Sequence, residues 1–387
     1  MNILVPYLSR WNSINRSRYV QILSRLAQNG HNVYLAQPPA MSSEDSGFVE
    51  SREDSLNTIR LIDVEMPPLF WNAALPLGKV VKKGAYCLKL NAAIGRMIRA
   101  YDIDAVLFYS MALYPLAGRD DVVSVYDLGD DHVDLLRHEL GKFSTRPVIR
   151  LAERLLKKTL SRCDCVFSVS HHLAQKYFPD SIHLPNGVDM DAIRPGSGKH
   201  LRPAGPGPVV GFVGSLEYFI DFQQILDAAW LRRDCTFVVA GGGRQYRRLQ
   251  SEKQRLGLGN LILTGGLDHE EILKYVDSFD ICLSPFRLSP LTHGACPIKL
   301  FEYLAFHKPV ISSRIAEVQR IGGGFLYWAD SASELAARID EIVRQPREAA
   351  GRAQQGFEVL QRHYIWPRIA DRFAEVVQER VEEKRRC

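Results

Sequence analysis

Residues 293–313, HGACPIKLFEYLAFHKPVISS, contain one complete helix pattern and the strand that follows it. Pro297 suits the first position of a helix, where its missing N–H costs nothing. The apolar helical run ends at His-Lys-Pro, and the β-branched residues after it predict a short buried strand. A helix followed at once by a buried strand is the repeating unit of a parallel α/β sheet.

The same alternation extends over almost the whole chain and predicts two sheets in series. The strands of the first sheet are predicted from NILVPYL (2–8), NVYLAQ (32–37), AVLFYS (105–110), VVSVYDL (122–128), CVFSVS (165–170) and SIHLP (181–185). The strands of the second are predicted from VVGFVG (209–214), CTFVVAGGG (235–243), LILTGG (261–266), ICLSPF (281–286), KPVISS (308–313) and GFLYWA (324–329). Amphipathic helix patterns lie between these runs, so both sheets are expected to be parallel and covered by helices.

The length of 387 residues is comfortable for two domains. A stretch rich in proline and glycine shows neither helix nor strand period and is predicted to be a linker at 191–208. The first domain is then 1–190, the second is 209–365, and a final helix covers 366–387. Two Rossmann-like, doubly wound α/β domains that face a cleft are expected, with ligands at the carboxyl ends of the strands.

Charge and cysteine usage narrow the class of protein. A net charge of +5 is compatible with a phosphate-bearing ligand or an anionic membrane face, and too weak to indicate nucleic acid. Seven cysteines without a CxxC pair indicate reduced thiols in a cytoplasmic protein and no zinc site. The N-terminus lacks a signal-peptide pattern and no window is apolar enough to span a bilayer, so we expect any membrane contact to be peripheral.

The start of the helix after Pro297 suggests an anion site. Free N–H groups and the helix dipole favour a phosphate there, and Lys299 adds a full positive charge in the first turn. Glu302 follows at i+3 on the same face and can accept hydrogen bonds from the two hydroxyls of a ribose. This layout fits a nucleoside diphosphate. The alternative is an exposed Lys–Glu pair on an ordinary helix.

Two glycine-containing loops follow strands of the second domain. Gly214 and Ser215 can offer backbone N–H groups to a phosphate, or can simply form a tight turn. Gly241 and Gly242 belong to VVAGGGRQY, which lacks the GxGxxG spacing and the later acidic residue of a dinucleotide site. We expect this second loop to approach the ligand closely.

Carboxylates follow a strand of the first domain in YDLGDDHVDLL, residues 126–136. Asp130 or Asp131 can act as a general base that accepts a proton from a hydroxyl, and His132 is an alternative base. One of the two aspartates can instead cap the helix that follows. We expect one to cap and the other to act in catalysis.

Two basic segments of the first domain are candidate contact surfaces. Arg16 and Arg18 lie in the first loop and helix start, where an acceptor-binding role and a solvated loop are both open. Further on, Phe70, Trp71 and Leu75 precede Lys79, Lys82, Lys83 and Lys89. Aromatic side chains beside lysines suit an anionic lipid surface, and a core helix with a solvated basic face is the alternative.

Together these motifs resemble the GT-B glycosyltransferases, close to family 4. The matching segments are LPNGVD, GFVGS, VVAGGG, LTGGLDHEEILKYVDSFDICLSPF, PIKLFEYLAFHKPVISS and HYIWPRIADRF, over roughly residues 183–375. The first domain matches more loosely. CPIKLFEYLA resembles a branch of bacterial polysaccharide and teichuronic-type transferases and the glucuronosyltransferase of xanthan assembly.

The resemblance implies roles for individual residues. Glu302 would hold the donor ribose, while Lys299 and the loop from Ser289 to Cys296 would hold the diphosphate and sugar, with Arg287, His293, Gly294 and Pro297 among the donor-binding residues. The final helix would cross back to the first domain. Many family members have a second glutamate at the position of Gly294 or Ala295, which this chain lacks.

The expected activity is therefore transfer of a sugar from a nucleoside-diphosphate sugar, with uridine as the expected base, to a hydroxyl of a glycan or lipid-linked acceptor. The family resemblance implies no metal and no other cofactor. The alternatives are a nucleotide-sugar epimerase of the same fold and a non-catalytic sugar-nucleotide-binding protein. An aspartate base favours inversion of the sugar, whereas family 4 as a whole retains configuration.

Overall fold

The computed structural model describes residues 1–11, 17–39, 50–53, 59–66, 78–141, 144–205 and 207–386, with the backbone alone at 50–53 and 78–80. The chain divides into two compact units. Unit 1 comprises Met1–Leu184 and Pro367–Cys387, and unit 2 comprises Pro185–Trp366. Each is described below by itself.

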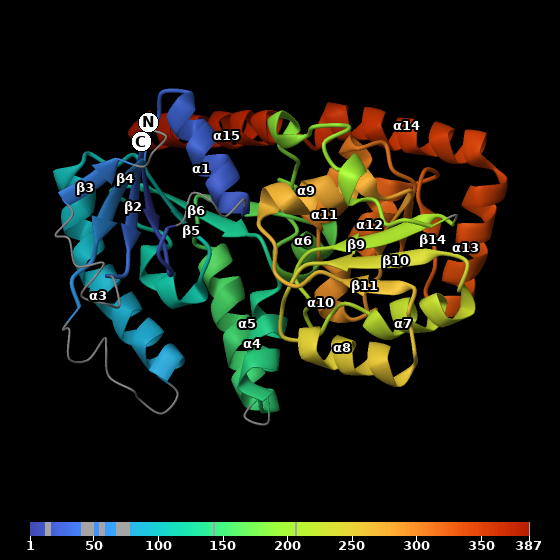
Figure 1. Cartoon of the computed structure of the whole chain (residues 1–387). Helices are drawn as coiled ribbons and strands as arrows, with labels where there is room; N and C mark the ends of the chain where they lie inside the picture. The colour runs from blue at the N-terminus through green and yellow to red at the C-terminus, as the bar shows by residue number, and fades with distance from the viewer. Residues whose placement is uncertain are drawn as a thin grey trace. The chain divides into compact units, whose positions relative to one another are not determined.

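Unit 1 is built on a sheet with the strand order β3-β4-β2-β1-β5-β6-β7-β8 (Figure 1). Its strands are β1 (Asn2–Pro6), β2 (Asn32–Gln37), β3 (Glu50–Glu53), β4 (Ile59–Asp63), β5 (Ala105–Phe108), β6 (Val123–Leu128), β7 (Cys165–Ser168) and β8 (Ile182–His183). All neighbouring strands pair in parallel except β3, which runs antiparallel to β4 at the edge. The central strands β5, β6 and β7 are buried along their whole length, as expected for a parallel sheet covered on both faces.

The helices of unit 1 connect these strands in the order that the sequence predicts. They are α1 (Arg18–Gln28), α3 (Gly78–Ala100), α4 (His132–Leu140), α5 (Arg146–Leu160), α6 (His171–Tyr177) and α15 (Trp366–Arg386), together with the 3-10 helix η1 (Met111–Leu116). Both α3 and α5 pack against η1. The end of α15 is fixed to unit 1 by Lys384, whose ammonium binds Asp164 at 3.0 Å and the carbonyl of Val122 at 3.0 Å.

Unit 2 is built on a parallel sheet with the order β11-β10-β9-β12-β13-β14. Its strands are β9 (Val209–Val213), β10 (Thr236–Ala240), β11 (Leu261–Leu263), β12 (Ile281–Ser284), β13 (Val310–Ser312) and β14 (Tyr327–Trp328). The chain order reverses between β9 and β12, and in such sheets ligands bind at this point beyond the carboxyl ends of the strands.

Helices cover both faces of the second sheet, with α7 and α8 on one side and α9 and α11 on the other (Figure 1). The helices are α7 (Phe222–Leu231), α8 (Tyr246–Arg255), α9 (His269–Ser278), α10 (Pro290–His293), α11 (Ile298–Ala305), α12 (Ala316–Gly322), α13 (Ala332–Arg344) and α14 (Pro346–His363). The predicted class, two doubly wound α/β sheets in series, is confirmed, and the edge strands β3 and β4 are additions that were not predicted from the sequence.

The segment expected to be a linker packs against unit 2. It contains two short 3-10 helices, η3 (Met190–Ala192) and η4 (Lys199–Leu201). Arg202 forms a two-pronged ion pair with Asp280 at 2.7 and 2.8 Å, and the N–H of Gly198 donates to Asp277 at 2.8 Å. The structural division between the units lies at Leu184–Pro185, ahead of the boundary expected at residue 190.

None of the helices formed by the described residues combines the length and the apolar character needed to cross a bilayer.

Candidate functional site

The start of α11 in unit 2 presents an ammonium that forms no ion pair with a described residue. Helix α11 begins at Ile298, and Pro297 is its N-cap. The helix therefore starts one residue later than the sequence predicts. The Nζ atom of Lys299 lies 4.0 Å from the ring centre of Phe212 and 5.9 Å from that of Phe286. Among the described residues it makes no hydrogen bond and no ion pair. Such an ammonium is available to an anionic ligand.

Burial disfavours the charged form of Lys299, although its surface remains partly accessible. The loss of water lowers the pKa of Lys299 to about 7, and the nearby carboxylate of Glu302 opposes this shift without reversing it. A lysine with this pKa is poised to take up a proton when a diphosphate binds beside it.

Glu302 lies one turn further along α11 and is held by a histidine. Its side chain is 8% exposed, and its Oε1 lies 2.7 Å from Nε2 of His269, the first residue of α9. A carboxylate only accepts hydrogen bonds, so the imidazole donates from Nε2. The described residues give the second oxygen, Oε2, no hydrogen bond. Glu302 is therefore oriented and keeps an open acceptor.

His269 was not among the residues predicted from sequence. It stands in the segment DHEE, where Asp268 and Glu271 form a capping box at the start of α9. This local signal explains the segment completely, so nothing in the sequence indicates that the histidine contacts a residue 33 positions away.

The two glycine loops of unit 2 interlock at the ends of β9 and β10. Gly214 has φ +117°, and a Cβ there would come within 3.0 Å of Nζ of Lys299. A Cβ at Gly241 would lie 2.3 Å from the carbonyl oxygen of Gly214, and the N–H of Leu216 donates to the carbonyl of Gly242 at 2.9 Å. The glycines thus allow two loops and the Lys299 ammonium to approach each other. Ser215 between them is exposed.

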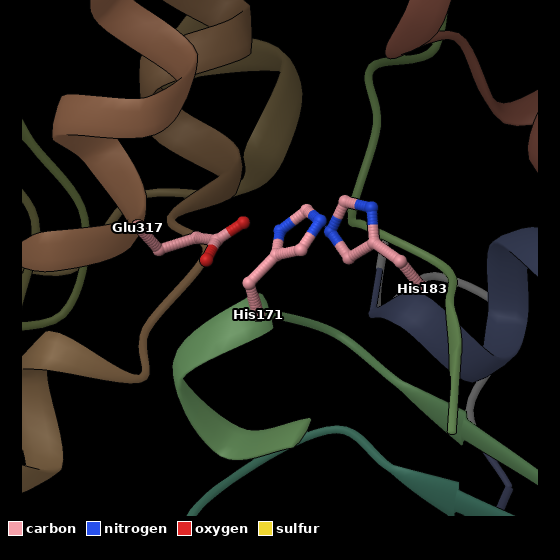
Figure 2. Close-up of side chains that lie close together, drawn as sticks. All are labelled: His171, His183 and Glu317. Atoms are coloured by element: carbon pink, nitrogen blue, oxygen red, sulfur yellow. The ribbon is translucent and has the colours of Figure 1, made fainter. Parts of the chain in front are cut away.

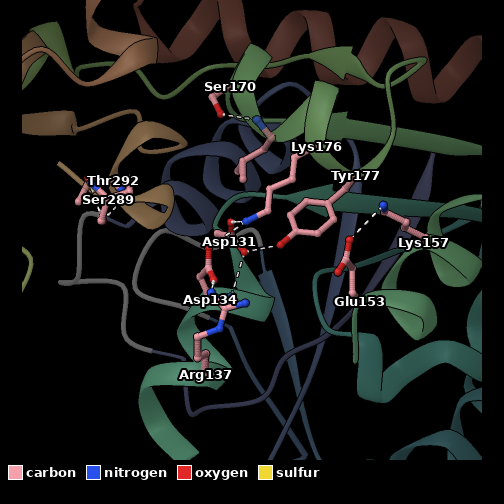
Figure 3. Close-up of polar contacts among 11 residues, drawn as sticks. Asp131, Asp134, Arg137, Glu153, Lys157, Ser170, Lys176, Tyr177, Ser289 and Thr292 are labelled. Carbon is pink, nitrogen blue, oxygen red and sulfur yellow. Dashed lines mark hydrogen bonds and ion pairs between the residues drawn. The ribbon is translucent and has the colours of Figure 1, made fainter. Parts of the chain in front are cut away.

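The loop before α11 is ordered by side-chain caps. Ser289 and Thr292 form a capping box at α10, and both are drawn in Figure 3. The hydroxyl of Thr292 also donates to the carbonyl of Arg287 at 2.6 Å. His293 accepts from the N–H of Ala316 through Nδ1 at 3.1 Å, while Gly294 ends α10 as its C-cap. Arg287 itself is exposed at the surface of unit 2.

In unit 1, Asp131 is the capping aspartate. Its side chain accepts from the N–H of Asp134 at 3.0 Å, from Lys176 at 2.5 Å and from the Tyr177 hydroxyl at 2.6 Å. Figure 3 shows Lys176 and Tyr177 of α6 pointing at this carboxylate. Burial favours the protonated form of Asp131, but the bonds from Lys176 and Tyr177 outweigh burial and lower its pKa. Asp131 is therefore a structural anion that joins α4 to α6.

Asp130 has a different environment. Its side chain is exposed, and the described residues give its carboxylate no hydrogen bond. The surrounding protein displaces water, and the charges of Asp127 and Asp131 add to this effect, so the pKa of Asp130 is raised to about 6. A carboxylate with a raised pKa at the end of a strand suits a general base.

His132 follows directly and is neutral at pH 7. Its Nε2 is covered by protein without a hydrogen-bond partner, and burial lowers its pKa to about 4. Of the three residues predicted as catalytic, Asp130 is the one with an accessible and unengaged side chain.

Arg18 forms an ion pair inside unit 1. Its guanidinium is 7% exposed and donates from Nε and Nη2 to the two oxygens of Asp127 at 2.8 and 2.9 Å. This pair joins the start of α1 to the end of β6. The geometry favours a structural role over the expected contact with an acceptor. Arg16 lies outside the described residues, as do Phe70, Trp71 and Leu75.

Two histidines at the carboxyl end of β7 and β8 were also not predicted. His171 begins α6 and His183 ends β8, and the centres of their rings lie 4.0 Å apart with the ring planes tilted by 36° (Figure 2). Glu317, also drawn there, belongs to α12 of unit 2. The adjacent pair His171-His172 directly after a strand was the available signal in the sequence.

Comparison with known proteins places these features in a family context. Residues 207–345 match the family model described as "Glycosyl transferases group 1". Much of unit 2 thus matches this family, and the resemblance to bacterial polysaccharide glycosyltransferases noted from the sequence is confirmed. The match covers the glycine loops, His269, Lys299 and Glu302.

Two curated relatives are similar over part of the chain. A putative teichuronic acid biosynthesis glycosyltransferase, TuaH of Bacillus subtilis, is 26% identical over 236 residues, which is 59% of this chain and 55% of that protein. O-antigen chain mannosyltransferase C of Escherichia coli is 27% identical over 216 residues, 54% of each chain. The chain spans about half the length of the curated relatives it matches.

Solved structures share the fold over nearly the full length. Sucrose-phosphate synthase from Thermosynechococcus elongatus has a TM-score of 0.77 at 17% identity, with 98% of both chains covered. HepE from Anabaena in complex with UDP has a TM-score of 0.66 at 14% identity, with 98% of this chain and 99% of that chain covered. These likenesses show the GT-B fold.

Proposed function

We propose that this protein is a glycosyltransferase that moves a sugar from a nucleoside-diphosphate sugar to a hydroxyl of a glycan or lipid-linked acceptor. The observation that carries the proposal is a pair of side chains on α11 within the match to the glycosyl transferases group 1 model. They are the ammonium of Lys299, which makes no ion pair with a described residue, and the oriented carboxylate of Glu302.

The donor residues follow from the chemistry of a nucleotide sugar. Lys299 and the N–H groups at the start of α11 bind the diphosphate, with Gly214 and Ser215 supplying further N–H groups. Glu302 accepts hydrogen bonds from the ribose hydroxyls. His293, Gly294, Pro297 and Arg287 line the sugar and phosphate end, and Gly241 and Gly242 keep the loop behind Lys299 small.

The proposal assigns catalysis to Asp130. Its carboxylate takes the proton of the acceptor hydroxyl as that oxygen attacks the anomeric carbon, and the bond from this carbon to the diphosphate breaks. Lys299 and the dipole of α11 stabilise the negative charge of the departing diphosphate, so no metal is required in this scheme. Attack assisted by an aspartate base inverts the anomeric configuration.

The names of similar proteins support a role in cell-surface glycan synthesis. TuaH is named for teichuronic acid biosynthesis and mannosyltransferase C for the O-antigen chain, while HepE was solved with UDP. We therefore propose a UDP-sugar as the donor and a polysaccharide or its lipid-linked precursor as the acceptor. A lipid-linked acceptor would place the protein in the cytoplasm, at the inner face of the membrane.

Product analysis tests this function. The protein is incubated with UDP-, GDP- or ADP-sugars labelled in the sugar, with and without a lipid extract from a bacterium that makes surface glycans. The proposal predicts labelled sugar in the lipid fraction for one donor class, and loss of this product with Asp130→Asn. Conversion of the donor to a different sugar nucleotide without any acceptor would instead show an epimerase and contradict the proposal.

A further inference from the structure

Positive charge is concentrated on two helices of unit 1. Helix α3 contains six lysines and arginines and no acidic residue, and α5 contains five with a single glutamate. These two helices together have a net charge of +10, twice the +5 of the whole chain, so the remaining residues are net negative. The positive charge of the protein is therefore local.

Apolar side chains are exposed among these cations. On α5, Leu151 is 67% exposed and Val148 is 41% exposed, between Arg146, Arg150 and Arg154. The buried stripe of this helix is formed by other residues, among them Ile149, Ala152 and Leu156, so Val148 and Leu151 are not needed for packing. On α3, Leu88 is 75% exposed beside Lys89.

Helices α3 and α5 are neighbours of the same element, because both pack against η1. The Nδ2 of Asn91 on α3 donates to the carbonyl of Ala112 in η1 at 3.5 Å. Lys158 of α5 lies over the ring of Tyr114 in η1 at 5.6 Å, and Arg162, just beyond α5, donates to the Tyr114 hydroxyl at 2.6 Å. Figure 1 shows α3 in light blue and α5 in green. We call the exposed residues of α3, η1 and α5 the basic face.

We infer that the basic face docks on an anionic lipid bilayer. Long cationic side chains bind acidic headgroups while exposed leucine and valine side chains enter the headgroup boundary, which is the pattern of surface-lying amphipathic helices. A soluble polyanion would use the charges but gain nothing from Leu88, Val148 and Leu151.

Helix α7 of unit 2 provides the contrast. Trp230 and Leu231 of α7 are 57% and 49% exposed, but α7 contains no lysine or arginine. Single exposed apolar residues of this kind are common on protein surfaces and indicate nothing by themselves. On the basic face, exposed apolar side chains lie beside positively charged side chains, which attract the acidic headgroups of lipids.

The structure extends the interpretation drawn from residues 70–89. That interpretation relied on Phe70 and Trp71, which lie outside the described residues, and on the lysines of α3. The present inference relies on α5 and its contact through η1, and it does not depend on glycosyl transfer.

Vesicle flotation of the full chain tests the inference without donor or acceptor. Vesicles of phosphatidylcholine are compared with vesicles of equal parts phosphatidylcholine and phosphatidylglycerol, at low and physiological salt. We expect binding to the anionic vesicles alone, weakened by salt. Arg146→Gln/Arg150→Gln/Arg154→Gln should weaken binding at least about tenfold. Leu88→Ser/Leu151→Ser should also weaken it about tenfold while leaving the charge unchanged.

A matched control removes three exposed arginines from unit 2, as Arg247→Gln/Arg344→Gln/Arg347→Gln, and should bind as the wild type does. All altered side chains are exposed, so the variants are expected to fold, and a melting curve verifies this. The inference is overturned if the wild type ignores anionic vesicles or if the control loses as much binding as the α5 variant. It is also overturned if the leucine variant binds the anionic vesicles as the wild type does. In that case, equal capture of the wild type and the leucine variant by heparin would identify a soluble polyanion as the partner.

Discussion

Nε2 of His269 lies 2.7 Å from Oε1 of Glu302, which joins the first residue of α9 to the middle of α11. The bond fixes one oxygen of a nearly buried carboxylate and leaves the other without a described partner. If Glu302 holds the ribose, His269 is the residue that orients it.

Removing this imidazole should weaken donor binding without removing it. His269→Ala deletes one hydrogen bond to a charged group, which is worth about 1.5–3 kcal/mol, so we expect roughly a tenfold or greater rise in the donor Kd. His269→Gln, which can still donate, should retain most of the affinity. Titration calorimetry with the nucleotide measures both, and His200→Ala, an exposed histidine of η4, is the control. An unchanged Kd in His269→Ala would show that Glu302 needs no orientation.

The pKa of Lys299 leads to a pH dependence of donor binding. Since burial lowers this pKa to about 7, the free protein carries the ammonium below pH 7 and a neutral amine above it. A diphosphate favours the ammonium, so affinity should fall as the pH rises through 7 and binding should take up protons at pH 8. Calorimetry in buffers of different ionisation enthalpy detects this uptake. Proton release, or no proton change, would contradict the assignment.

The same shift has a consequence for stability. A lysine whose pKa is lower in the folded state disfavours folding at every pH below its unfolded value, and the cost is complete below about pH 7. Lys299→Met should therefore raise the melting temperature at pH 6 while it weakens donor binding. A variant that lost both stability and binding would indicate that Lys299 is a structural cation.

Asp130 and Asp131 should separate catalysis from stability. Asp130→Asn should reduce turnover about 100-fold or more with the donor Kd unchanged, because the side chain is exposed and makes no described hydrogen bond. Since the pKa of Asp130 is raised in the folded state, its ionised form disfavours folding at pH 7, so the melting temperature should be equal to that of the wild type or higher. In the wild type, the rate should rise with pH through about 6 as Asp130 loses its proton. A normal rate in Asp130→Asn would exclude this residue as the base.

Asp131→Asn should instead unfold more easily, because it leaves the ammonium of Lys176 beside a neutral amide; we expect a cost of about 3 kcal/mol. The pKa of Asp131 is lowered in the folded state, so its stabilisation is present above its unfolded pKa and is lost as the pH falls below it. Urea unfolding at pH 7 measures the difference. A stability equal to that of the wild type would show that the network around Asp131 contributes nothing.

The fold could be predicted because its signals are local. Every parallel strand of both sheets except β4 corresponds to a predicted apolar run, and helix patterns separate them. The strand β3 has the sequence Glu-Ser-Arg-Glu, which contains no apolar residue, so no hydrophobic pattern predicts a strand there. Its pairing with β4 comes from the backbone of the sheet edge.

Only those residues of the candidate site that lie close together in the sequence could be predicted. Lys299 and Glu302 share one helix, and that spacing indicates their common face. The partners of Arg18, Asp131 and Glu302 lie 109, 46 and 33 positions away, and such contacts leave no trace in a local pattern. The sequence therefore left open which aspartate caps α4, and the bond from the N–H of Asp134 to the side chain of Asp131 answers it.

The central claim is that α11 binds a nucleotide, and a thermal-shift panel of UDP, GDP, ADP and their sugar conjugates tests it most directly. It is run on the wild type, on Glu302→Ala and on Glu270→Ala, a control glutamate of α9 that is 79% exposed. A ligand that binds the folded state raises the melting temperature by mass action. We predict a shift with one nucleotide class, expected to be UDP, in the wild type and Glu270→Ala, and its loss in Glu302→Ala. The absence of a shift with any nucleotide, or an equal shift in Glu302→Ala, would contradict the account.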